Sequence, residues 1–139
     1  MKSFEFEVRR SYLLRLDYGR DLLEQLEEFL KAKRIYAAYV SGVGAVRSAE
    51  IGYYDQEKRT YVKKEINRPL EILNLSGNVS LKDEEPFLHL HIILGKDGEV
   101  YGGHLFRAEV FACEVFLIVL EGEIPKRGPD HQTGLHLWI

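Results

Sequence analysis

Three histidines in the segment PFLHLHIILGKDGEVYGGHLF have a spacing that suits metal chemistry. His89 and His91 alternate along one expected strand, so both side chains point to the same face. Asp97 and Gly98 predict a type I′ hairpin turn, because both central positions of that turn need a positive φ. Counting outward from this turn places His91 opposite His104. Since opposed residues have Cβ atoms about 4.5 to 5.5 Å apart, the three imidazoles should converge.

Three neutral imidazoles are a standard ligand set for Zn²⁺, and such a site leaves one position for water or a substrate. Gly102 and Gly103 remove side chains beside the rings, which lets a ligand or another backbone approach closely. The same glycines are typical of a β-bulge, which would turn His104 to the opposite face. The alternative to a metal site is a set of histidines satisfied by ordinary hydrogen bonds. His131 and His136 lie in the C-terminal segment, and we do not assign them to the site.

Two glutamates also invite a chemical interpretation. Glu114 interrupts the apolar run VFACEVFLIVL, which is typical of a central strand, and a buried carboxylate is costly unless it is paired. Glu114 would then orient a metal ligand, act as a general base, or pair with an arginine such as Arg127 or Arg68; we favour the ion pair. Glu71, in RPLEILNLSGNVS, allows the same interpretations.

Two further motifs indicate packing more than chemistry. Cys113 is the only cysteine, so the chain forms no internal disulfide and no thiolate-only zinc site, and its apolar surroundings predict a small buried side chain. Residues 41–45, SGVGA, superficially resemble a phosphate-binding loop. They lack G-x-G-x-x-G and the P-loop lysine, and a strand is expected to follow, so close backbone packing at a bend is the better interpretation.

The elements that must position these residues are mostly strands. Residues 20–33 place leucines and Phe29 at helical spacing and predict the one long helix. Alternating or β-branched segments predict strands at 3–9, 12–16, 36–46, 48–54, 59–66, 70–76, 87–95, 99–106, 110–121 and 133–138. The expected fold is α+β, an α/β two-layer arrangement in which a largely antiparallel sheet carries one packed helix.

Length and composition predict a single domain over residues 1–139. The chain is 45% hydrophobic, which is enough for a core without disulfides. The N-terminal residues alternate apolar and charged side chains, and no segment has the roughly 18 apolar residues of a membrane span. We therefore expect a cytoplasmic protein with no membrane partner.

The charge gives no overall attraction to nucleic acid, because the formal net charge is −3. Basic pairs occur at 9–10, 63–64 and 126–127, and scattered pairs of this kind are usually solvated surface. No helix-turn-helix, zinc-finger or basic-zipper pattern is present to read base edges. Any binding to DNA would need a local patch.

The motifs SGVGAVRSAEIGYYD, LEILNLSGNVS, FLHLHIILGKDGEVYGGHL and R-x-x-D-x-x-T-G-L follow one another in the sequence. Their order resembles the plants-and-prokaryotes-conserved domain, or PPC, family over nearly the whole chain. The resemblance implies a largely antiparallel sheet flanked by helix and a homotrimeric assembly. The match to the prokaryotic form H-x-H followed by G-G-H-L implies a metal-ligand role for His89, His91 and His104.

The resemblance also implies partners. Plant members of the family carry this domain beside an AT-hook and are nuclear DNA-binding regulators. In them the domain mainly supports trimerisation and partner binding. The present sequence has no Arg-Gly-Arg-Pro hook and no basic tail. Our leading hypothesis is a homotrimeric assembly and binding module, with DNA or a protein as partner and a three-histidine zinc site. The alternative is a small enzyme in which this zinc activates water and Glu114 or Glu71 assists proton transfer.

Overall fold

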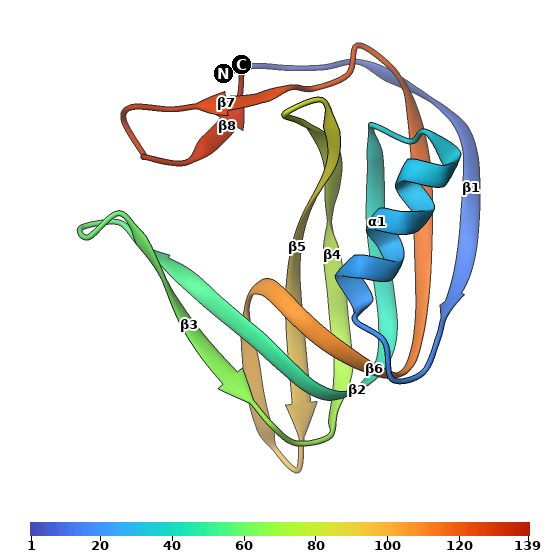
Figure 1. Cartoon of the computed structure of the whole chain (residues 1–139), viewed down its shortest axis with the longest axis vertical. Coiled ribbons are helices and arrows are strands. Elements are labelled where there is room, and N and C mark those ends of the chain that lie inside the picture. Colours follow the sequence, from blue (N-terminus) through green and yellow to red (C-terminus); the bar gives the residue numbers. More distant parts are fainter.

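The protein is a mostly antiparallel sheet with one helix packed on it, as the sequence predicts (Figure 1). The computed structural model describes residues 1–139. Its elements are β1 (Phe6–Leu16), α1 (Leu22–Lys33), β2 (Ala38–Asp55), β3 (Thr60–Ile66), β4 (Leu70–Lys82), β5 (Glu85–Lys96), β6 (Glu99–Gly122), β7 (Arg127–Pro129) and β8 (His136–Trp138).

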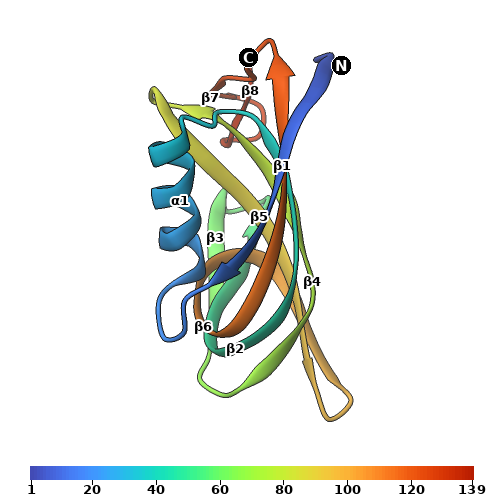
Figure 2. The ribbon, with the colours of Figure 1, turned by 90° about the vertical axis from the view of Figure 1, so that its right-hand side faces the viewer.

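The main sheet curls because its longest strand, β6, changes partner along its length. The order is β1-β6-β5-β4-β2-β3, and β6 also pairs with β2. β5 pairs only with the first part of β6, as far as His104, and from His104 onward β6 runs beside β2. Figure 2 shows the bend in β6 where this exchange takes place. The exchange makes the sheet concave next to His104.

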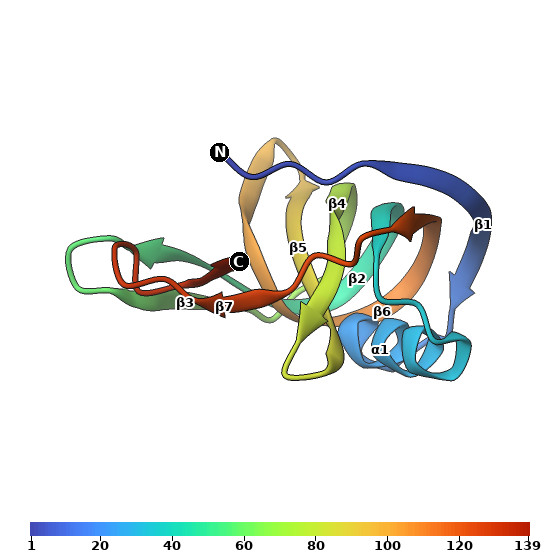
Figure 3. The ribbon, with the colours of Figure 1, turned by 90° about the horizontal axis from the view of Figure 1, so that it is seen from above.

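Helix α1 begins and ends where its terminal residues predict. The carboxylate of Asp21 caps the N-terminus by accepting from the Glu24 amide at 3.0 Å, and it also accepts from the Ala108 amide on β6 at 2.9 Å. Arg34 ends the helix in the left-handed conformation, with φ 54°. The buried side of α1 packs against β5 and β6 (Figure 3). No helix in the protein is long and apolar enough to span a membrane.

The hydrophobic core fills the space between α1 and the curled sheet. It comprises 26 buried residues, drawn from the helix, from β1 to β6 and, at Ile35, from the segment between α1 and β2. Leu22, Leu26 and Leu30 of the helix meet side chains such as Leu90 and Leu117 from the sheet in this one cluster. The opposite face of β1, β6 and β2 is left without a covering layer.

Several predicted strands prove to be parts of longer ones. Three of the observed strands each join two segments that were predicted as separate strands. Strand β1 joins 3–9 and 12–16, β2 joins 36–46 and 48–54, and β6 joins 99–106 and 110–121. Register shifts occur at these joins, for example between Val8 and Arg10, and each shift interrupts the alternation that marks a strand in sequence. Only the last part of the C-terminal segment predicted at 133–138 forms a strand, β8. Its partner β7 has three residues, too few to show the alternation of apolar and polar side chains that predicts a strand.

Candidate metal centre

The β5–β6 hairpin has the predicted turn and register. Asp97 and Gly98 form the turn with φ values of 53° and 81°. His91 pairs directly with His104, and no register shift interrupts the pairing between the turn and this point. The prediction from the Asp-Gly turn is therefore confirmed, and the alternative in which a bulge turns His104 to the opposite face is wrong.

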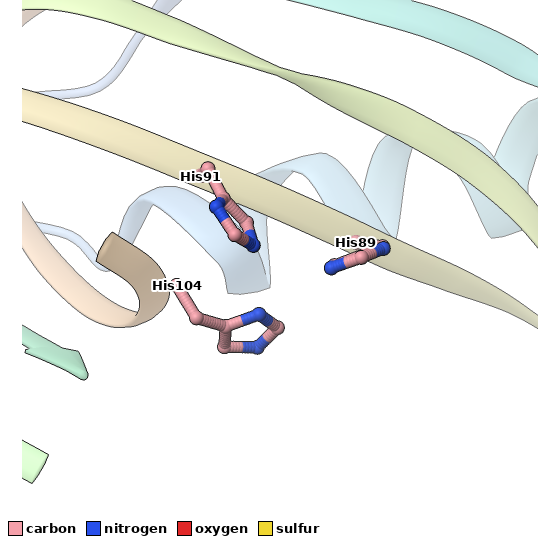
Figure 4. A group of neighbouring side chains, drawn as sticks. All are labelled: His89, His91 and His104. Carbon is pink, nitrogen blue, oxygen red and sulfur yellow. The ribbon is translucent and has the colours of Figure 1, made fainter. Parts of the chain in front are cut away.

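The three imidazoles meet on the face of the β5–β6 hairpin that lies opposite its core residues. His89 and His91 come from β5 and His104 comes from the bend in β6 (Figure 4). One ring nitrogen from each residue lies within 4.8 Å of the others, and the ring centroids are 5.2, 5.3 and 5.5 Å apart. Small side-chain rotations bring such nitrogens to the about 3.4 Å that separates ligands on one tetrahedral ion with Zn–N bonds of about 2.0 to 2.1 Å.

Gly103 is required for this geometry. A Cβ at Gly103 would lie 2.5 Å from the main-chain oxygen of Gly52 on β2, whereas the nearest atom to a Cβ at Gly102 would be 3.6 Å away. Close approach of another backbone thus explains Gly103, which is one of the two roles the sequence suggested. The contact holds β2 against β6 where His104 leaves the hairpin.

The electrostatic surroundings of His89 and His104 favour their neutral forms. Burial, together with the neighbouring His89 and His91, lowers the pKa of His104 to about 4. Burial and the nearby Arg127 guanidinium also lower the pKa of His89. The Nδ1 atom of His104 is buried without a hydrogen-bond partner. A neutral imidazole with an unused nitrogen is what a metal ion requires, so these residues fit a metal ligand set.

Aromatic rings and one arginine surround the three histidines. Tyr61 and Phe106 lie against His104, with ring centroids 5.1 and 4.7 Å away. Arg127 approaches from β7, with its Nη2 atom 3.5 Å from Nδ1 of His89. The aromatic rings therefore pack against His104, and Arg127 places a positive charge beside His89.

The site opens into a cavity of about 690 Å³ between the histidines, β3 and the C-terminal β7–β8 hairpin. His136 lines this cavity but is not part of the three-histidine group. His131 does not line the cavity, and its main-chain oxygen accepts from Arg59. The structure thus groups His89, His91 and His104 and leaves the two C-terminal histidines out of the cluster.

The predicted burial of Glu114 is wrong. Glu114 is exposed, as is Glu71, and neither side chain lines the cavity. The reason is that α1 covers only one face of β6, so the alternate residues of an apolar strand face an uncovered surface. The proposed arginine partners are engaged elsewhere: Arg68 pairs with Glu99, and Arg127 bonds neutral groups beside the histidines.

The remaining sequence motifs have structural roles. Cys113 is buried, and burial raises the pKa of its thiol to about 12, which confirms it as a small apolar side chain. Residues 41–45 lie within β2. A Cβ at Gly44 would lie 2.2 Å from the main-chain oxygen of Ala112, so this glycine serves close backbone packing and no phosphate loop is formed.

The basic pairs do not gather into one patch. Arg9 pairs with Glu121, Lys63 with Glu50 and Lys126 with Glu84. Each pair thus has a carboxylate beside one of its cations. The interpretation of these residues as solvated surface fails for Arg127, which is half-buried and lines the cavity beside the histidines.

Sequence reasoning missed Arg127 as a neighbour of the histidines. The motif R-x-x-D-x-x-T-G-L, which begins at Arg127, could have indicated a closed loop that fixes the position of this arginine. The Asp130 carboxylate accepts from the amide and the hydroxyl of Thr133 at 2.9 and 2.7 Å, and Gly134 has φ 76°. These contacts close the β7–β8 loop and present Arg127 to the cavity.

The fold is similar to solved structures over its whole length. A metal-containing protein from Archaeoglobus fulgidus is 69% identical, with a TM-score of 0.99 over 100% of this chain and 99% of that one. A plant- and prokaryote-conserved protein from Pyrococcus horikoshii is 41% identical, with a TM-score of 0.95 over 100% and 97% of the two chains. A candidate DNA-binding protein from Bacteroides thetaiotaomicron is 25% identical, with a TM-score of 0.87 over 98% and 96%.

Curated relatives match by sequence over most of this chain. A bifunctional protein GlmU from Synechococcus is 34% identical over 130 residues, which are 90% of this chain. The match covers 20% of that relative, so the chain spans about a fifth of its length. Residues 3–121 match the Plants and Prokaryotes Conserved (PCC) domain. This match includes all three histidines and ends before Arg127. The chain belongs to the Plants and Prokaryotes Conserved domain family.

Proposed function

We propose that the protein is a zinc-dependent binding module, with His89, His91 and His104 as the metal ligands. The observation that carries the proposal is the unpartnered, buried Nδ1 of His104 within a group of three converging ring nitrogens. Leaving a buried polar atom without a partner costs about 1 to 3 kcal/mol, and a metal ion is one way to satisfy such a cluster. The similarity to a metal-containing protein supports the same assignment.

The cavity favours ligand binding over hydrolysis. Zinc bound by three protein ligands supplies a Lewis acid with an open position. No Asp or Glu lines the cavity that adjoins the histidines, so Glu114 and Glu71 do not reach it. The enzyme hypothesis with Glu114 or Glu71 therefore loses its general base. A small molecule that binds beside the metal fits the arrangement better.

The module is proposed to assemble as a homotrimer of single-domain chains. The uncovered face of the sheet carries large apolar side chains, and cross-strand pairing of Leu13 with Phe116 and of Ser41 with Phe116 places β1, β6 and β2 in one row. Leu13 is 73% exposed and Phe116 is 43% exposed. Apolar faces of this kind usually mark a protein interface. A trimer has a mass of about 48 kDa, from three chains of 16.1 kDa.

DNA binding is the second candidate function, and the candidate DNA-binding relative favours it. The negative net charge and the ion-paired basic residues count against it. The test is affinity for duplex DNA as a function of salt, because contacts with phosphates give a steep inverse dependence. Salt-insensitive binding would remove DNA as a partner.

Zinc binding is tested on untagged protein that has been stripped of metal with a chelator. We expect one zinc per chain by competition titration with a zinc indicator. His89→Ala, His91→Ala and His104→Ala should each weaken the affinity by at least about 100-fold, since loss of a ligand costs more than loss of the groups around it. Glu114→Gln is the matched control and should bind zinc like the wild type. Wild-type protein that takes up no stoichiometric zinc would contradict the proposal.

A further inference from the structure

Arg127 carries a charge that no carboxylate of the protein neutralises. Its Nε donates to Ser80 Oγ at 2.7 Å, Nη2 donates to Asn78 Oδ1 at 3.1 Å, and Nη1 donates to the main-chain oxygen of His136 at 3.1 Å. All of these acceptors are neutral. The guanidinium also lies 5.2 Å from the ring centre of Phe87. The side chain is thus held in place by several contacts while its positive charge remains available to a ligand.

The cavity as a whole concentrates positive charge. Arg59, Lys82 and Arg127 line it, and no acidic residue does. Arg59 donates to two main-chain oxygens and Lys82 lies over the ring of Phe87, so neither is paired with a carboxylate. Of the other sixteen lysines and arginines, nine form ion pairs, and none of the sixteen lines the cavity.

This distribution runs against the overall charge of the chain, which is −3. A pocket lined by cations raises the local concentration of anions. A guanidinium forms charge-assisted hydrogen bonds with carboxylates and phosphates. Arg127 uses one N–H each of Nε, Nη1 and Nη2 within the protein, which leaves a second N–H of Nη1 for such a bond. The electrostatics of the cavity therefore select a negatively charged occupant.

The size and the walls of the cavity limit that occupant further. A volume of about 690 Å³ falls within the range of about 300 to 1,000 Å³ that is usual for small-molecule sites. Tyr54, Tyr61 and Phe87 contribute aromatic rings to the wall. Aromatic surface beside fixed cations suits an organic body that carries an anionic head group.

We infer that the cavity binds a small organic oxyanion, a carboxylate or a phosphate ester, with its head group between Arg127 and the three histidines. The inference rests on the proposed function in placing that head group beside a metal. The contribution of Arg127, Arg59 and Lys82 belongs to the chain itself. Anion binding to metal-free protein can therefore be measured separately.

The test uses three probes of similar shape: benzoate, phenyl phosphate and the neutral benzamide. Each is titrated calorimetrically into full-length protein, both metal-free and zinc-loaded. We expect benzoate or phenyl phosphate to bind at least about tenfold more tightly than benzamide, because hydrogen bonds to charged groups are the stronger ones. A preference between the two anions then identifies the head group as carboxylate or phosphate.

Two variants assign the binding to the cavity cations. Arg127→Met should weaken binding of the preferred anion by about tenfold or more, and Lys82→Met should weaken it by a smaller factor. Lys82 donates no hydrogen bond, so its variant keeps the test valid if Arg127→Met does not fold. Arg9→Met, which removes the same charge from an exposed ion pair outside the cavity, is the control and should bind like the wild type.

Equal affinities for benzoate, phenyl phosphate and benzamide would overturn the inference, as would failure of all three to bind. Equal weakening by Arg9→Met and Lys82→Met would also overturn it. Failure of the protein to take up zinc has a different meaning. It would remove the proposed metal, while tighter binding of an anion than of benzamide to metal-free protein would still support the oxyanion site.

Discussion

His104 and Glu114 lie on the same strand, β6, and both have side chains that can bind a metal or transfer a proton. Their surroundings differ. His104 sits at the bend where β6 exchanges β5 for β2, and there it converges with the imidazoles of His89 and His91. Glu114 sits farther along, where β6 is flanked by β1 and β2 and its side chain faces the uncovered surface.

The difference shows that curvature creates the site. The pairing of β5 with β6 and the bend in β6 place His89, His91 and His104 beside one cavity, which the β7–β8 hairpin also lines. Farther along the same strand, alternate residues such as Glu114 are exposed. The bend and the uncovered face therefore respond differently to substitution, and this contrast can be tested.

The largest effect is expected from Gly103→Ala at the bend. The new methyl group would meet the main-chain oxygen of Gly52, and overpacking against backbone should lower the free energy of unfolding by about 3 kcal/mol. Gly102→Ala has room for its methyl group and should change stability by less than about 1 kcal/mol. Urea denaturation of both variants checks the prediction. Equal destabilisation would mean that the close contact of β2 and β6 does not shape the bend.

The next effect is expected from Phe116→Glu on the uncovered face. A charge placed within an apolar interface should weaken subunit association by about 100-fold or more, so the variant should elute as a monomer in size-exclusion chromatography with light scattering. Zinc binding should remain, because Phe116 does not line the cavity that adjoins the histidines. A wild-type protein that is monomeric at all concentrations would remove this face as an interface.

A smaller effect is expected when the pH is lowered. His104 has a lowered pKa in the folded protein, so between about pH 6.5 and pH 4 the unfolded chain binds a proton that the folded chain does not. Metal-free protein should therefore lose about 2 kcal/mol of stability across this range, after allowance for the partial exposure of the ring. His104→Gln should lose less over the same range. Identical pH profiles for the two proteins would show that this imidazole is not kept neutral by its surroundings.

The smallest effect is expected from Glu114→Gln and Glu71→Gln. Both side chains are exposed and form no ion pair, so each variant should unfold within about 0.5 kcal/mol of the wild type. Thermal unfolding of metal-free protein checks this. A loss above about 2 kcal/mol would point to the buried, paired carboxylate that the sequence suggested.

The sequence predicted most accurately what depends on local chemistry. The Asp97-Gly98 turn determines its own hairpin, so the pairing of His91 with His104 followed without knowledge of the fold. The burial of Glu114 could not be predicted in the same way, because it depends on which face of β6 the helix covers. The position of Arg127 was also beyond local reasoning, since it depends on where the chain runs after β6 ends.

The central claim is that three histidines from a curved hairpin hold one zinc ion and leave a position open to the cavity. X-ray absorption spectroscopy of the zinc-loaded, untagged protein tests it most directly. We expect three imidazole nitrogens at about 2.0 to 2.1 Å and one further light-atom ligand, which benzoate or phenyl phosphate should perturb. A shell with sulfur, with fewer than three imidazoles, or with no change at the saturated metal in His104→Ala would contradict it.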